Sequence, residues 1–181
     1  MSIEKYSAQG CMPERPPAQH EGRERIRTWL PGDASALADL YRRSVMHYGP
    51  RAYSPAQVAA WAGAISAEKI AARSGDGRHV AIAVDADGRI LGWGDLEADG
   101  HVDFLYCAPE AAGRGTGAML IEALEAHARA AGMPRLTVEA SELARPLFAR
   151  LGFTLLQRNE LAIDAVGIHN FSMEKRLLDA P

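Results

Sequence analysis

The chain has 181 residues, of which 48% are hydrophobic and 24% charged, and its formal net charge is −3. This composition is ordinary for a globular protein with a core of its own. The small negative charge gives no broad positive field, so we expect no nucleic-acid partner. No apolar run is long enough to span a membrane and no signal peptide is visible, so we expect a cytoplasmic protein without a membrane partner. Two cysteines form no disulfide framework, and no metal site is predicted.

The beginning of the chain predicts an extension followed by one domain. Residues 1–23 contain three prolines, mixed charges and no sustained periodicity, which is typical of a flexible segment. Residues 24–178 are then expected to form a single domain. Its first strand is predicted at Ile26–Leu30. Helices are predicted from Asp33 or Ser35 to about Met46, from Pro55 to Ala62, and over Glu68–Ser74.

The remaining pattern predicts strands with two further helices. Two strands, His79–Val84 and Arg89–Leu96, are joined by a turn that ends in glycine. A meander of strands followed by a strand–helix–strand unit indicates an α+β fold with a mixed sheet. The other predicted strands are Val102–Cys107, Leu136–Ala140, Phe153–Leu161 and Ile168–Lys175. A helix from about Leu143 to Leu151 is predicted directly after Leu136–Ala140.

The most informative stretch lies between Val102 and Gly132. A short apolar strand is followed by three glycines at alternate positions, and then by a pattern of helical period. Glu125 and Arg129 on the outer face of that helix are spaced for an i,i+4 ion pair. The inward face is predicted to carry Leu120, Ile121, Leu124 and Ala128.

This order of elements is a way to hold an anion. The free N–H groups of the first helical turn and the helix dipole both favour negative charge, and glycines let a phosphate approach the main chain. A glycine-rich turn without any ligand is the alternative that these residues alone leave open. The spacing of Gly113, Gly115 and Gly117 is that of neither a P-loop nor a Rossmann fingerprint.

Two motifs resemble a known family. Residues 112–117, Ala-Gly-Arg-Gly-Thr-Gly, resemble the acyl-CoA loop of the GCN5-related N-acetyltransferases (GNAT), whose consensus is Gln/Arg-x-x-Gly-x-Gly/Ala. Residues 148–153, Phe-Ala-Arg-Leu-Gly-Phe, resemble that family's Tyr-x-x-x-Gly-Phe. Residues 53–57 with Trp61, 138–141 and 170–175 are similar to a YafP-like bacterial branch. The chain departs from the family pattern at Ala112 and Phe148.

The resemblance implies a fold, a donor and a reaction. The fold would be a mixed, mostly antiparallel central sheet flanked by helices, and acetyl-CoA would be the co-substrate. An acetyl group would pass to a primary amine or hydroxylamine of a small molecule by direct attack in a ternary complex. The residues expected to contact CoA are Leu105, Tyr106, Cys107, Arg114, Gly115, Thr116, Gly117, Ala118, Ser141 and Phe148.

Amine acetylation needs a base and a donor to the oxyanion. Asp103 is the predicted base because it is the one charge in an apolar strand, at a position where the family often places a carboxylate. A structural role for Asp103 is the alternative, with Glu97 and Asp95 as second choices for the base. The resemblance assigns the oxyanion to a main-chain N–H at Cys107 or a close neighbour, while the thiol itself is expected to be a packing group.

Phe148 stands where the family usually has the tyrosine that protonates the leaving sulfur. Phenylalanine cannot donate a proton, but a thiol pKa of about 8.5 makes the thiolate a tolerable leaving group. Water, Tyr106 or Ser141 could supply the proton. The alternative is a catalytically weak acyl-CoA-binding or regulatory domain of the same fold.

The acceptor pocket is predicted from segments that the family folds over the open end of its cleft. Its expected members are Tyr53, Trp61, Glu97 and His169. The competing interpretation is that Trp61 belongs to a helix core and that the histidine lies on the surface. The sequence leaves open both the identity of the acceptor and whether the closing strands form a homodimer.

Overall fold

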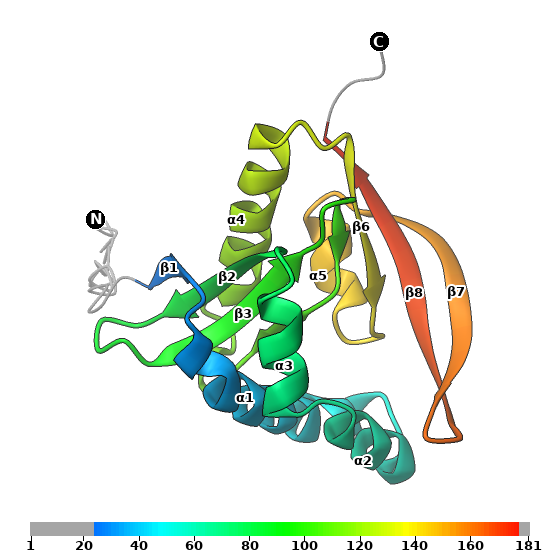
Figure 1. Cartoon of the computed structure of the whole chain (residues 1–181). Helices are drawn as coiled ribbons and strands as arrows, with labels where there is room; N and C mark the ends of the chain where they lie inside the picture. The colour runs from blue at the N-terminus through cyan, green and yellow to red at the C-terminus, as the bar shows by residue number, and fades with distance from the viewer. Residues whose placement is uncertain (1–23, 178–181) are drawn as a thin grey trace, which may run out of the picture.

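The computed structural model describes residues 24–177. The predicted extension, residues 1–23, and residue 178 of the predicted domain lie outside the described residues. The strands form two four-stranded sheets with the orders β1-β2-β3-β5 and β4-β6-β8-β7. Helices α1, α2 and α3 lie on one side of β2 and β3, and α4 lies on the other side (Figure 1). The predicted α+β class, with mostly antiparallel strands flanked by helices, is confirmed, and the strands divide into an antiparallel sheet and a mixed sheet.

The first sheet is antiparallel throughout. Its strands are β1 (Arg25–Thr28), β2 (His79–Val84), β3 (Ile90–Leu96) and β5 (Leu105–Cys107). The helices beside it are α1 (Ala34–Tyr48), α2 (Pro55–Gly63) and α3 (Ala67–Ser74). Helix α2 begins where predicted because the Gln57 N–H donates to Ser54 Oγ and the Ser54 N–H donates to Gln57 Oε1, a reciprocal cap in front of Pro55.

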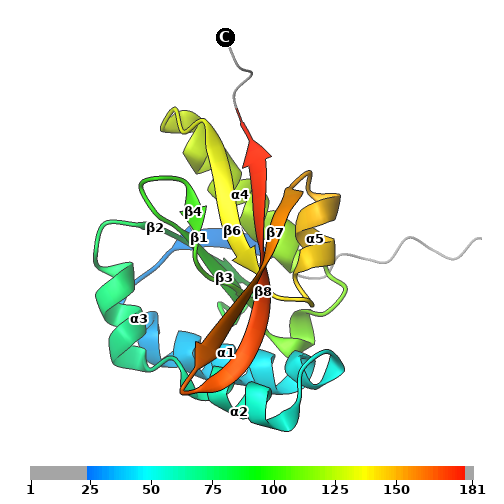
Figure 2. The same cartoon turned by 90° about the vertical axis from the view of Figure 1, so that its right-hand side faces the viewer.

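The second sheet contains the one parallel pair of the described residues. Strand β4 (His101–Val102) runs parallel to β6 (Arg135–Ala140), whereas β8 (Val166–Arg176) is antiparallel to both β6 and β7 (Thr154–Ile163). The long β7–β8 hairpin twists away from the sheet toward α2 (Figure 2). There the Gln57 Nε2 donates to the Gly167 carbonyl at 2.7 Å. The hairpin therefore brings its tip beside the helices.

Helix α4 (Thr116–Ala130) is the predicted amphipathic helix. Its predicted inward residues are at most 1% exposed and pack between the sheets. The Arg129 Nη2 lies 2.8 Å from Glu125 Oε1, as the spacing predicted. Helix α5 (Arg145–Arg150) is shorter than predicted because residues 141–144 form a turn, in which the Ala144 N–H donates to Ser141 Oγ.

The predicted continuous strand Val102–Cys107 is wrong, because the chain changes sheets at Asp103-Phe104. Strand β4 pairs with β6, but β5 pairs with β3, so the two sheets diverge at this point. The buried Asp95 carboxylate fixes the break, since its Oδ1 accepts the Phe104 N–H at 2.8 Å. A gap consequently opens between β5 and β6.

A buried arginine gathers the carboxylates around this break. The Arg78 side chain is 7% exposed, and its guanidinium lies between 2.8 and 3.1 Å from four carboxylates. Two of them, Asp95 and Asp103, flank the point where the sheets separate. The four acidic residues are Asp76, Asp95, Glu97 and Asp103.

We expect Arg78→Met to destabilise the fold by about 3–5 kcal/mol, because it leaves buried carboxylate charge without its cation. The free energy of unfolding in urea measures this loss. Arg158→Met is the matched control, since Arg158 is 56% exposed and its ion-pair partner within residues 24–177 is the exposed Glu160. Its effect should stay within about 0.5 kcal/mol. Equal losses in the two variants would contradict the role given to Arg78.

Candidate active site

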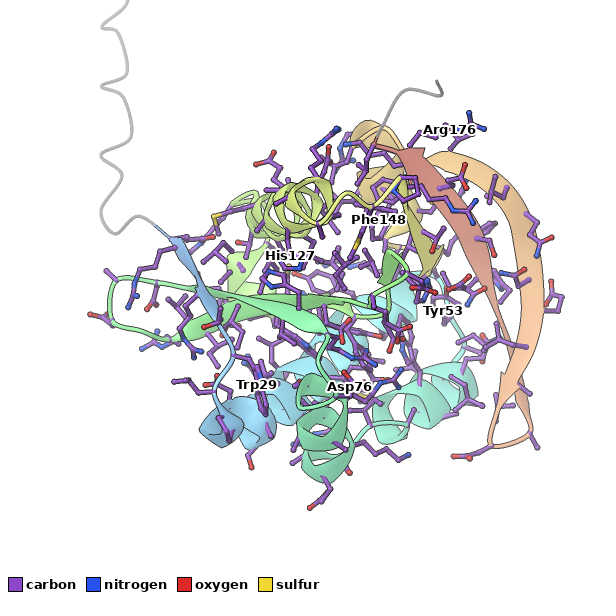
Figure 3. All side chains as sticks on the ribbon, turned by 45° about the horizontal axis from the view of Figure 1, so that its top comes forward. Trp29, Tyr53, Asp76, His127, Phe148 and Arg176 are labelled. Atoms are coloured by element: carbon purple, nitrogen blue, oxygen red, sulfur yellow. The ribbon has the colours of Figure 1, made fainter. Side chains whose placement is uncertain are left out.

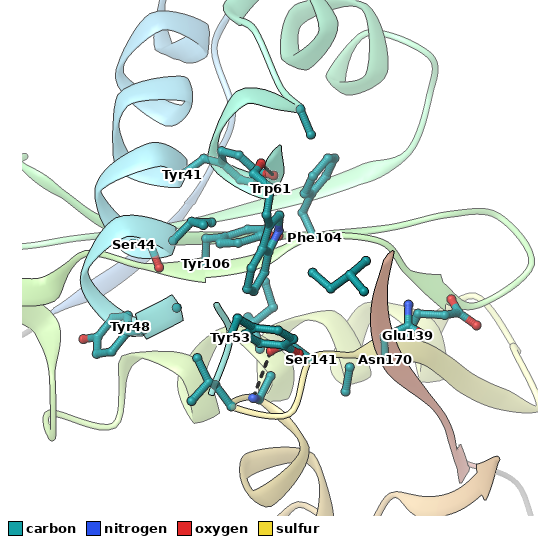
Figure 4. A pocket seen from close by; sticks show the side chains of 18 of the residues that line it. Tyr41, Ser44, Tyr48, Tyr53, Trp61, Phe104, Tyr106, Glu139, Ser141 and Asn170 are labelled. Carbon is teal, nitrogen blue, oxygen red and sulfur yellow. Dashed lines mark hydrogen bonds between the residues drawn. The ribbon is translucent and has the colours of Figure 1, made fainter. Parts of the chain in front are cut away.

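A cavity of about 770 Å³ occupies the gap between the diverging sheets (Figure 4). One wall is strand β5 and another is the end of β6, while α1, α2 and the β7–β8 hairpin close the rest. Its charged or titratable side chains include Arg51, Arg73, Asp103, Glu139 and His169. Its aromatic side chains are Tyr41, Tyr48, Tyr53, Trp61, Phe104, Tyr106 and Phe148.

The aromatic wall is held by hydrogen bonds. The Tyr41 hydroxyl donates to the Trp61 carbonyl at 2.7 Å, and the Trp61 Nε1 donates to Tyr106 Oη at 3.2 Å. The Tyr53 and Trp61 rings meet edge to face with centroids 5.4 Å apart. These rings are therefore fixed in place, and the structure brings Tyr53, Trp61 and His169 to one cavity. Glu97 is placed elsewhere, in the Arg78 cluster.

Strand β5 offers main-chain donors to the cavity. The Ala108 N–H donates to Leu91 O and the Asp95 N–H donates to Phe104 O across the β3–β5 ladder. Because an antiparallel ladder alternates, the N–H groups of Leu105 and Cys107 point away from β3. Strand β5 is the last strand of its sheet, so these two groups face the gap.

The Cys107 side chain points toward helix α4 and is a packing group. A Cβ on Gly117 would lie 3.7 Å from the Cys107 Sγ. Burial, with a contribution from the nearby Glu24 carboxylate, raises the pKa of the Cys107 thiol to about 12. The thiol is therefore neutral at pH 7 and is a poor nucleophile.

The glycine loop before α4 is open on one side and tightly packed on the other. Gly113 and Gly115 have φ values of +74° and +87°, and a Cβ on either would meet nothing within 4 Å. A Cβ on Gly117 would instead lie 3.0 Å from Leu147 Cδ2. The first turn of α4 is thus accessible from the loop side, where an anion can reach its N–H groups.

Two hydrogen bonds limit which loop groups can bind an anion. The Arg114 N–H donates to the Ala111 carbonyl at 3.2 Å. The Thr116 hydroxyl donates to Glu24 Oε2 at 2.7 Å, and Thr116 is 1% exposed. We therefore expect the anion on the N–H groups of residues 115–118, with the Thr116 hydroxyl contributing nothing directly.

Phe148 and Ser141 stand at the other side of the cavity. Phe148 is 1% exposed, meets Phe153 edge to face with centroids 5.0 Å apart, and points into the interior (Figure 3). The Ser141 hydroxyl accepts the Ala144 N–H at 3.2 Å and so shapes the turn before α5. Both residues line the cavity and also stabilise the fold, Phe148 by packing and Ser141 by its hydrogen bond.

This arrangement of strand, glycine loop, helix and cavity agrees with the comparison to known families. Residues 50–177 match the family described as "Acetyltransferase (GNAT) domain". The chain belongs to the GNAT family.

Individual relatives of this GNAT chain support the assignment. It is 28% identical over 151 residues to the uncharacterized N-acetyltransferase YafP of Escherichia coli (strain K12). The matched region is 82% of this chain and 93% of YafP. A GCN5-related N-acetyltransferase structure from Rhodopseudomonas palustris matches with 37% identity and a TM-score of 0.79, over 84% and 95% of the two chains. A phosphinothricin acetyltransferase from Sinorhizobium meliloti, in complex with AcCoA, shares the fold with 21% identity and a TM-score of 0.67, over 85% and 88%.

Asp103 of this GNAT domain is engaged by two cations. Its Oδ2 contacts the Arg73 guanidinium and lies 3.1 Å from the Arg78 Nη1. The guanidinium of Arg73 also lies over the Phe104 ring, 5.0 Å from the centroid. Asp103 lines the cavity as predicted, but its carboxylate is already paired with two arginines. The general-base role of Asp103 stays a prediction.

The tyrosines of the GNAT cavity are weak acids. Burial raises the pKa of Tyr106 above its usual range, and burial also raises the pKa of Tyr53. Tyr106 is therefore a poor source of a proton for a leaving thiolate. The Tyr53 hydroxyl has another task, since it accepts the Glu142 N–H at 2.8 Å and donates to the His169 carbonyl at 3.3 Å.

Sequence reasoning missed three side chains of this site. Arg73 and Arg78 carry no motif, and the charges around them resemble an ordinary solvated surface. Glu142 follows strand β6 in a turn that no periodicity marks, although it lies beside His169.

No helix within residues 24–177 is both long and apolar enough to cross a bilayer.

We expect the Cys107 thiol to react slowly with iodoacetamide at pH 7.5 in the native GNAT domain, because its raised pKa leaves almost no thiolate. Mass spectrometry of a Cys11→Ser variant, native and in denaturant, measures this difference. Rapid labelling of the native protein would show that the thiol is reactive.

Proposed function

We propose that this GNAT domain transfers an acetyl group from acetyl-CoA to a primary amine or hydroxylamine of a small molecule, with donor and acceptor bound together. The observation that carries the proposal is the glycine loop and helix α4 at the end of β5, the strand that also lines the cavity. The S. meliloti relative in complex with AcCoA supports the choice of donor.

The main chain supplies the donor contacts. The N–H groups of residues 115–118 would hold the pyrophosphate, because Gly113 and Gly115 leave the space in front of them open. Arg114 adds a cation to the loop. The unpaired edge of β5 would bind the amide-containing arm of CoA, as exposed strand edges bind extended chains. Bound acetyl-CoA supplies the activated acetyl group.

The same edge provides the electrostatic part of catalysis. The N–H groups of Leu105 and Cys107 point into the gap, so either can donate to the acetyl oxygen as negative charge develops on it. Because Phe148 cannot donate and Tyr106 is a weak acid, the leaving thiolate takes its proton from water. Ser141 lines the cavity nearby but is engaged in its turn.

The acceptor would bind against the aromatic wall. Tyr53, Trp61 and Tyr106 are fixed by contacts with one another and leave an apolar surface suited to a small, partly apolar amine. His169 supplies a polar group on the same cavity. The Arg78 cluster that holds Glu97 lies outside this surface, so the proposed acceptor set is Tyr53, Trp61 and His169.

We expect Gly115→Val to weaken CoA binding at least about tenfold, because a β-branched residue cannot easily adopt the left-handed conformation that begins α4. Isothermal titration calorimetry with CoA measures the change. Gly88→Val is the matched control, since Gly88 also has positive φ and open surroundings but lies in the β2–β3 turn. Equal affinities in the two variants would place the pyrophosphate elsewhere.

We expect the unmodified protein to release CoA thiol with at least one member of a panel of small amines and hydroxylamines, faster than acetyl-CoA hydrolyses alone. Phe148→Tyr should change the rate only modestly, because a thiolate already leaves acceptably near neutral pH. Thiol release followed by absorbance measures both. Acetyl-CoA binding without transfer to any acceptor, in either form, would instead identify an acyl-CoA-binding domain.

A further inference from the structure

The cavity contains a histidine held by a carboxylate. His169 on β8 lines the cavity, and its side chain is 19% exposed. Its Nε2 lies 3.4 Å from Glu142 Oε2. The other carboxylate oxygen of Glu142 accepts the Arg145 Nη2 at 2.7 Å. That hydrogen bond lowers the pKa of Glu142, so the carboxylate beside the imidazole is ionised at neutral pH.

The surroundings of this pair fix its geometry. The Tyr53 hydroxyl bonds both main chains, at the Glu142 N–H and the His169 carbonyl. The centroid of the imidazole ring lies 5.5 Å from the centroid of the Tyr53 ring. It lies 5.7 Å from the centroid of the Phe171 ring, which it meets edge to face. An imidazole between two aromatic rings and a carboxylate has little freedom to rotate, as a proton-transfer group requires.

The charged and titratable groups around His169 come from the turn after β6, helix α5, strand β7 and the segment before α2. Glu142 and Arg145 approach from the turn and helix after β6, and the Arg145 guanidinium also lies 4.8 Å from the Phe171 ring centroid. Glu160 is the register partner of His169 on β7, but its carboxylate pairs with Arg158. The phenol of Tyr53 faces the ring from the segment before α2. Glu142 is thus the carboxylate in direct contact with the imidazole.

The other titratable groups of the cavity have competing partners. Asp103 is bound by Arg73 and Arg78, and Glu139 lies 3.1 Å from His101 Nε2. Cys107 and Tyr106 are too weakly acidic to become anions near neutral pH. The imidazole of His169 lines the cavity, and its charged neighbour is a carboxylate that can orient it.

We propose that His169 is the general base that accepts the proton of the acceptor nitrogen, with Glu142 as its positioning residue. The inference deepens the proposed function and rests on it. In this proposal the hydrogen is on Nε2, which faces the Glu142 carboxylate, and the lone pair is on Nδ1. As the acceptor nitrogen bonds to the acetyl carbon, its proton moves to Nδ1. The carbon–sulfur bond breaks with its electron pair on sulfur, and the thiolate takes a proton from solvent.

The test compares kcat/KM against pH, with the best acceptor of the amine panel, in four variants. His169→Gln should lower kcat/KM about 10²–10⁴-fold and remove the fall of kcat/KM at low pH, the acidic limb of the pH profile. Calorimetry should show an unchanged acetyl-CoA affinity. Glu142→Gln should keep that limb but lower kcat/KM, because the imidazole keeps its proton-accepting nitrogen and loses the carboxylate that orients it. Asp103→Asn should retain the limb. His101→Gln, which breaks a similar pair with Glu139 at a histidine that does not line the cavity, should match the unmodified protein.

A second readout needs neither donor nor acceptor. In NMR spectra of the histidine ring nitrogens of the free protein, the signals lost in His169→Gln should show the hydrogen on Nε2, and Glu142→Gln should move part of it to Nδ1. An active His169→Gln variant with its acidic limb intact would overturn this inference alone, as would loss of the limb in Asp103→Asn instead. Absence of transfer by the unmodified protein would overturn the proposed function first and this inference with it.

Discussion

The ion pair between Arg78 and the buried Asp95 is the interaction on which the site depends. Asp95 accepts the Phe104 N–H and so ends one sheet pairing where the next begins. Burying a carboxylate is costly, and Arg78 offsets that cost by bringing a cation to the same place. The break at residues 103–104 separates β4, which pairs with β6, from β5, which pairs with β3, and the cavity lies between β5 and β6.

The elements themselves were predictable because their signals are local. Helix α4 has a helical apolar period and a glycine start, and α2 has a capping box with proline, so both begin where the sequence indicated. The break after Val102 was not predictable in this way. The residues from Val102 to Cys107, apart from Asp103, favour a strand, and the partner strand changes within this range. That change is set by long-range pairing, which no local pattern records.

The candidate site also has parts with a local sequence signal and parts that depend on long-range contacts. The glycine loop was found from the sequence because main-chain binding of an anion requires glycines before a helix. The bond from Thr116 to Glu24 and the contact of His169 with Glu142 join residues that are distant or lie in turns. Such pairs exist only in the folded chain, and single charged residues give no sign of their partner. The aromatic cluster was foreseen only in part for this reason.

In the proposed function, N–H groups hold the donor, whereas side chains hold the acceptor. An N–H group survives almost any substitution of its own residue, but an aromatic wall changes shape with every replacement. Mutations can therefore accumulate around Tyr53 and Trp61 without loss of the acetyl donor. A lineage with this architecture can exchange one acceptor for another through a series of functional intermediates, since each of them still holds an activated acetyl group.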